Sequence, residues 1–86
     1  TDEALPYLEQ AAAAGYRQAL FVLGFVLYDA SQAKRDDCRA AELWQKSIAL
    51  EHPWTGYYLV NGYLDGRFDA CGLKLSEEQI ARYTQL

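Results

Sequence analysis

The segment 37–66 reads DCRAAELWQKSIALEHPWTGYYLVNGYLDG and predicts two helices joined by a short turn. Asp37 is a residue type that caps helix starts. The apolar positions that follow it share one helical face: Ala41, Trp44, Ile48 and Ala49. Pro53 cannot continue a helix but suits the first turn of the next one, with His52 as the cap-like residue before it. This segment therefore predicts one helix–turn–helix unit.

The second helix of this unit ends at Asp65-Gly66, which is a typical helix stop. Its apolar residues include Gly56, Val60 and Leu64, which we place on one face. Its aromatic residues are Trp54, Tyr57, Tyr58 and Tyr63. Aromatic side chains at helical spacing are usually core, and stacking on a ligand is the alternative interpretation.

The flanking sequence predicts three more helices. Residues 1–14 form an amphipathic helix that Gly15 ends, and residues 16–30 form a helix that is apolar nearly all round. Ser76 and Gln79 fit a capping box that opens a last helix over 76–86. No stretch alternates between apolar and polar residues as strands do, so the sequence predicts an all-α fold of about five helices in a single domain, 1–86.

Composition excludes several function classes. A net charge of −4 over 86 residues opposes non-specific nucleic-acid binding, which needs a basic face. The longest apolar run, 19–28, is far shorter than the ~20 residues that span a bilayer, so we expect no membrane span. With one histidine and two cysteines, the chain lacks the pattern of a zinc site, and we expect neither metal nor cofactor.

Similar features recur along the chain at spacings of 37 and 39 residues. They divide it into repeat 1 at 1–30, repeat 2 at 37–66 and a partial repeat or cap helix at 76–86. The paired residues are Ala4 with Ala41, Tyr7 with Trp44, Ala19 with Gly56, Asp37 with Ser76, Ala41 with Ile80, and Trp44 with Tyr83.

This pattern resembles the Sel1-like repeat, a relative of the tetratricopeptide repeat. The residues of the first copy that carry it are Ala4, Tyr7, Ala11, Ala12, Gly15, Ala19, Leu23 and Gly24, with Tyr28 one place late. The second copy departs from the family pattern: His52 stands where the family has Gly, Gly56 where it has Ala, and Val60-Asn61 where it has Leu-Gly. The spacings also exceed the ~34 residues of tetratricopeptide repeats.

The resemblance implies an α-solenoid of antiparallel helix pairs that binds another protein or a peptide and has no shared catalytic residues. A bacterial inhibitor or immunity-type adaptor is one form of such a scaffold. If the concave groove is used, its walls come from the first helix of each pair. The polar residues predicted to contact the partner are Glu9, Gln10, Glu42, Gln45 and Lys46.

The two cysteines lie at the same end of a predicted antiparallel helix pair. Cys38 is at the start of one helix and Cys71 lies just beyond the end of the next, so a disulfide between them is sterically reasonable. The alternative is two free thiols. A disulfide predicts a periplasmic or secreted protein, and free thiols predict a cytoplasmic one. Some secreted bacterial members of the family carry disulfides within their repeats, which favours the bond.

The sequence predicts no enzyme. A histidine base needs a nucleophile and an orienting partner, and the sequence around His52 suggests neither. We therefore assign His52 to a helix end. The alternative function is a secreted hydrolase, because some cysteine-containing relatives are described as penicillin-binding hydrolases.

Overall fold

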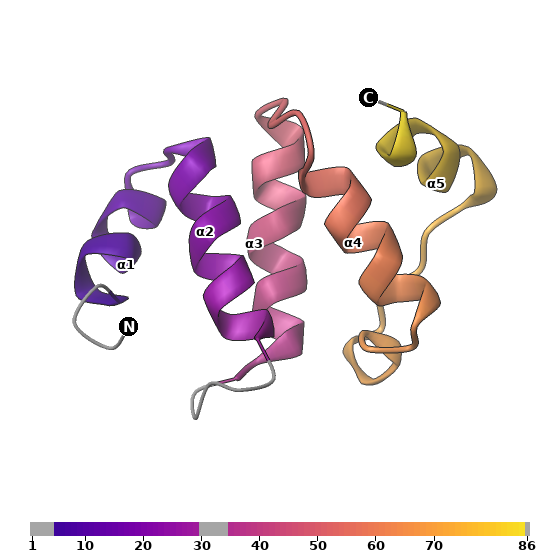
Figure 1. Ribbon diagram of the computed structural model, residues 1–86, viewed down its shortest axis with the longest axis horizontal. Coiled ribbons are helices and arrows are strands. Elements are labelled where there is room, and N and C mark those ends of the chain that lie inside the picture. The colour runs from indigo at the N-terminus through magenta and orange to yellow at the C-terminus, as the bar shows by residue number, and fades with distance from the viewer. Residues whose placement is uncertain (1–4, 30–34, 86) are drawn as a thin grey trace.

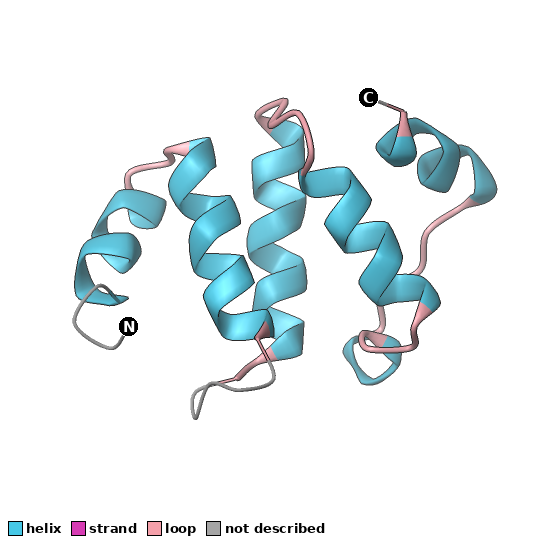
Figure 2. Ribbon diagram, in the orientation of Figure 1, coloured by secondary structure: helices cyan, strands magenta, loops and turns pink. Residues whose placement is uncertain are grey.

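A computed structural model describes residues 5–29 and 35–85, and it forms only helices, turns and loops in those ranges (Figures 1 and 2). The predicted all-α class is confirmed. The elements in chain order are α1 (Leu5–Ala13), α2 (Arg17–Tyr28), α3 (Asp37–Ala49), α4 (Thr55–Leu64), the short 3-10 helix η1 (Asp69–Cys71) and α5 (Glu77–Thr84). The parts of our predictions that fall on 1–4, 30–34 and 86 lie outside the described residues.

The helices stand in a row in chain order, and neighbours run in opposite directions (Figure 1). Each helix packs on the one before it and the one after it, with the largest contact between α2 and α3. The row measures 38 × 24 × 19 Å. This arrangement is the predicted succession of antiparallel helix pairs.

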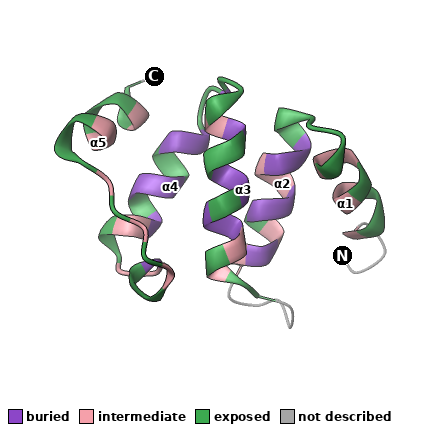
Figure 3. Cartoon of the chain, turned by 180° about the vertical axis from the view of Figure 1, so that it is seen from behind, coloured by how far each residue is buried: buried purple, intermediate pink, exposed green. Residues whose placement is uncertain are grey.

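The core lies along both sides of α3. Leu23 of α2 and Trp44 of α3 are fully buried, as are Leu59 of α4 and Phe68 just after it. In Figure 3, buried residues are concentrated on α2, α3 and α4, whereas α1 and α5 carry none in the described chain. The two outer helices therefore cover the core with half-buried residues only.

At two close contacts between helices, a residue of the neighbouring helix lies directly against a glycine. A methyl group on Gly24 would lie 2.5 Å from Nε1 of Trp44, and one on Gly56 would lie 2.6 Å from the carbonyl oxygen of Tyr83. The Trp44 indole also donates a hydrogen bond of 3.1 Å to the carbonyl oxygen of Phe21. The absence of a side chain thus allows α2 to approach α3, and α4 to approach α5.

Tyr7 is an exception to the predicted pairing of repeats. It corresponds to Trp44 by spacing, yet it is 75% exposed. Trp44 is covered by α2, the second helix of the preceding pair. Among the described residues no second helix precedes α1, so nothing equivalent covers Tyr7.

Three helices end with the same left-handed turn. Gly15 and Gly66 have φ values of +88° and +80°, and the amide of the residue after each donates to the carbonyl oxygen five residues earlier. Glu51 adopts the same conformation, with φ +64°, at the end of α3. The residue that takes the structural place of Gly15 is therefore Glu51, and our alignment of His52 with that glycine is wrong by one position.

The start of α3 also differs from the prediction. Asp36 caps this helix, because its side chain accepts a 3.1 Å hydrogen bond from the amide of Arg39. Asp37 is the first helical residue, and its carboxylate turns away toward two arginines. At α5 the predicted capping box of Ser76 and Gln79 is confirmed, with both reciprocal hydrogen bonds in place.

The boundaries and faces of α3 and α4 require further corrections. Helix α4 begins at Thr55, so Pro53 lies in the preceding turn, and the buried His52 bonds Thr55 rather than capping the backbone. Leu64 is 67% exposed, because eight residues rotate it by about 80° from Gly56 around the helix. Ala49 is exposed at the last turn of α3.

We predict that Gly24→Ala lowers the free energy of unfolding by about 1–3 kcal/mol, because the new methyl group overlaps the Trp44 indole. Chemical denaturation followed by circular dichroism measures this change. Asn61→Ala, at an exposed helical position, is the control and should change stability little. Combining Gly24→Ala with Trp44→Leu should cost less than the sum of the two single changes; additive costs would mean that the indole is not what excludes the methyl group.

Candidate protein-binding groove

A groove of about 620 Å³ lies between α3 and the segment that follows η1. Glu42 and Gln45, two of the predicted partner-binding residues, line it from α3. The opposite wall is formed by residues 71–74. The lining residues are Asp36, Cys38, Arg39, Ala41, Glu42, Gln45, Cys71, Gly72, Leu73 and Lys74.

The other predicted residues lie at the edge of this groove or outside it. Glu9 of α1 accepts two hydrogen bonds, of 2.5 and 2.7 Å, from the guanidinium of Arg39, which itself lines the groove. These bonds lower the pKa of Glu9, although burial opposes the shift. Gln10 and Lys46 are exposed but do not line the groove.

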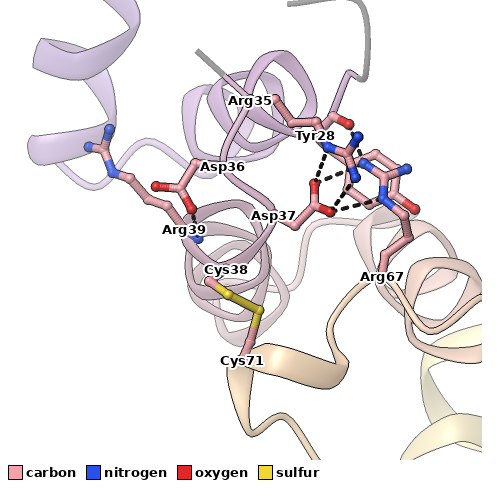
Figure 4. A network of polar contacts seen from close by, with 8 residues as sticks. All are labelled: Tyr28, Arg35, Asp36, Asp37, Cys38, Arg39, Arg67 and Cys71. Atoms are coloured by element: carbon pink, nitrogen blue, oxygen red, sulfur yellow. Dashed lines mark hydrogen bonds and ion pairs between the residues drawn. A yellow bond between two sulfur atoms is a disulfide. The ribbon is translucent and has the colours of Figure 1, made fainter. Parts of the chain in front are cut away.

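The wall after η1 is fixed to α3 by a disulfide. Cys38 and Cys71 are bonded, with their Cα atoms 5.3 Å apart (Figure 4). The predicted pair is confirmed, and the alternative of two free thiols is not observed. Phe68, the residue just before η1, is buried against Gly62. This contact anchors the chain between α4 and the groove wall.

Ion pairs form a second clamp between the start of α3 and the residues that follow α4. Asp37 accepts two hydrogen bonds from Arg67, at 2.8 and 3.0 Å, and two from Arg35, at 2.9 and 3.2 Å (Figure 4). Arg67 also lies 3.6 Å from the ring centroid of Tyr28 and donates to the carbonyl oxygen of that residue. Hydrogen bonds from Arg67, then from Arg35, hold the pKa of Asp37 far below its ordinary value.

Sequence reasoning did not find this clamp. Asp37 looked like a helix cap and Arg67 like part of a loop. The two residues are 30 positions apart, so no local spacing indicates that they meet. The available signal is indirect: the clamp lies at the same end of the antiparallel pair as the predicted disulfide.

A buried polar chain surrounds His52. Nδ1 of His52 and Oγ1 of Thr55 are 2.7 Å apart, Nε2 lies 2.7 Å from the Gln18 side chain, and Thr55 contacts Ser47 at 3.2 Å. The fold thus places a serine and a threonine near His52, contrary to our expectation. Both Ser47 and Thr55 are fully buried.

The remaining aromatic prediction is only partly confirmed. Tyr63 is half-buried, as expected of a residue packed against the core. Trp54, Tyr57 and Tyr58 are exposed instead of buried, although the Tyr58 ring still lies 6.1 Å from that of Trp44 between centroids. They form part of a second surface, which involves α2 and α4.

Comparison of the chain with protein-family models, with curated proteins and with solved structures finds no match. Across the described ranges, no helix has both the length and the apolarity needed to cross a bilayer. The same part of the chain holds no group of three or more His, Cys, Asp or Glu residues able to bind a metal.

We predict that replacing both cysteines, in Cys38→Ser with Cys71→Ser, lowers the free energy of unfolding by about 3–4 kcal/mol, since the bond closes a long loop of the unfolded chain. Hydrogen exchange should also accelerate locally, at the amides of 69–75. Wild-type protein treated with a reducing agent should show both effects. Acceleration in the helices with none at the amides of 69–75 would contradict a local clamp.

We predict that stability falls as the pH drops from about 7 to 5. Burial, followed by repulsion from Arg17, lowers the pKa of His52. The unfolded chain therefore takes up a proton near pH 6.5 that the folded chain resists, and the stabilisation present above that pH is lost below it. Thermal denaturation at several pH values measures this loss. His52→Gln should flatten the slope in this range, and an unchanged slope would assign the effect to other groups.

Proposed function

We propose that this protein is a non-enzymatic repeat scaffold of the Sel1-like type that holds a segment of another protein in the groove beside α3. The observation that carries the proposal is the groove itself, whose outer wall is tied to α3 by the Cys38–Cys71 bond and the Arg67–Asp37 ion pair. A wall fixed in this way is preorganised, so a partner loses little affinity to ordering it.

The repeat architecture supports this proposal. Antiparallel pairs follow one another in a row, and the Trp44 indole packs on Gly24 where α2 and α3 cross. In solenoid scaffolds, such rows present extended surfaces for protein partners. The family resemblance in the sequence points to the same class of function.

The chemistry of the groove suits a polar, extended segment. Asp36 and Glu42 contribute negative charge, Arg39 and Lys74 contribute positive charge, and Gln45 offers both a donor and an acceptor. A groove with charges of both signs favours a partner whose own charges lie opposite them in the complementary order. Apolar contact area contributes less to this selectivity. We therefore infer a protein segment with charges of both signs as the ligand.

The disulfide supports an oxidising compartment, because such bonds are rare in the reducing cytosol. We place the protein in the bacterial periplasm or outside the cell, where an inhibitor or immunity-type adaptor would act on an envelope protein. The secreted hydrolase is the less favoured alternative, because the hydroxyl groups beside His52 are buried.

The test is a charge reversal inside the groove. Partners captured by wild-type protein from an envelope extract should bind Glu42→Lys at least about tenfold more weakly, because the reversed charge meets the partner's matching group. Isothermal titration with the purified partner measures the change.

The matched control for that experiment is Lys46→Glu, an exposed reversal on the same helix but outside the groove. It should leave affinity within about twofold. Equal losses in the two variants, or no loss in Glu42→Lys, would reject the groove as the binding site.

A further inference from the structure

The bodies of α2 and α4 carry no charged residue. Residues 19–28 and 53–64 contain no Asp, Glu, Lys or Arg, whereas α3 alone carries Asp37, Arg39, Glu42 and Lys46. A surface helix usually has a charged or polar side facing water. The exposed side of these two segments therefore lacks the charged residues that a water-facing helix side usually carries.

Large apolar side chains are exposed on this side. Phe25, Trp54, Tyr57 and Tyr58 are between 37% and 48% exposed, and Leu64 is 67% exposed. The rings form a connected set: Phe21 lies 5.3 Å from Tyr58 between ring centroids, and Phe25 lies 5.9 Å from it. We call this surface the aromatic face: Phe21, Val22, Phe25, Val26, Trp54, Tyr57, Tyr58 and Leu64.

The aromatic face has the size of an interface core. An aromatic side chain has about 150–250 Å² of surface, so the four exposed rings leave roughly 350 Å² accessible. Leu64 and the partly buried valines extend this area. A standard interface covers about 800 Å² on each partner, of which about 450–520 Å² is apolar. The aromatic face thus supplies most of the apolar part of one such interface.

The face also carries both a hollow and a projection. A hollow of about 240 Å³ between α2 and the start of α4 is lined by six apolar or aromatic residues, of which Tyr58 is one. This volume is below the ~300–1,000 Å³ of small-molecule sites, which suits one large side chain instead. Tyr57, the residue before Tyr58 on α4, is 48% exposed, and its ring lies 6.0 Å from that of Tyr58 between centroids.

We propose that two copies of this chain associate through the aromatic face, each placing Tyr57 in the hollow of the other. A two-fold dimer uses the same patch on both subunits, so a patch must offer both hollow and projection. The absence of charge lets the two faces meet without repulsion at the contact. The groove beside α3 is formed by other residues, so this proposal does not depend on partner binding there.

The net charge of the chain predicts how salt affects this association. Each chain carries −4, so two copies repel through charges that lie outside the aromatic face. Salt screens that repulsion and leaves the apolar contact intact. Association should therefore strengthen as ionic strength rises, opposite to a contact made by ion pairs.

Sedimentation equilibrium of the wild-type chain from about 1 µM to 1 mM tests the proposal. We expect a monomer–dimer equilibrium whose dissociation constant falls at least about twofold between 0.05 and 0.5 M NaCl. A monomer throughout this range, or a dimer that salt weakens, would overturn it.

Variants locate the contact. Tyr57→Glu places a charge in the partner's hollow and should raise the dissociation constant at least about tenfold. Tyr7→Glu alters an aromatic residue that is even more exposed, but on α1, and should leave the constant unchanged. Circular dichroism confirms that each variant is folded. Equal effects of the two substitutions would refute association through the aromatic face.

Discussion

The Trp44 indole needs a neighbouring backbone without a side chain, and Gly24 provides it. This contact joins the first helix of one pair to the second helix of the preceding pair, and the indole also satisfies its only hydrogen-bond donor on the carbonyl oxygen of Phe21. Because α2 and α3 meet so closely there, α3 becomes the fully packed centre of the row. The groove beside α3 is lined by residues of this helix, so the packing that fixes α3 also fixes that wall of the groove.

The second constraint acts at the N-terminal end of α3. The segment after α4 has little core of its own, since Phe68 is its one fully buried side chain among the described residues. It is held by a covalent bond to Cys38 and by charge-assisted hydrogen bonds to Asp37. A small domain buries a limited fraction of its surface, so such links replace the missing apolar contacts.

Patterns within one helix or one pair were predictable from the sequence. Helical spacing gave the five helices, Ser76 and Gln79 gave the start of α5, and the antiparallel pairing of α3 with α4 gave the disulfide. Contacts that depend on the direction of a side chain were not predictable from the sequence. The choice of Asp36 over Asp37 as the cap depends on Arg67, which is distant in sequence. Of the five partner-binding predictions, Glu42 and Gln45 line the groove because they project from α3 toward the disulfide segment.

The links around Cys38 have a topological consequence. The bond spans the whole connection between α3 and α4, including the turn at Leu50–Trp54. A backbone cut in that turn would leave both fragments covalently attached, with Trp44 and Leu59 still buried between them.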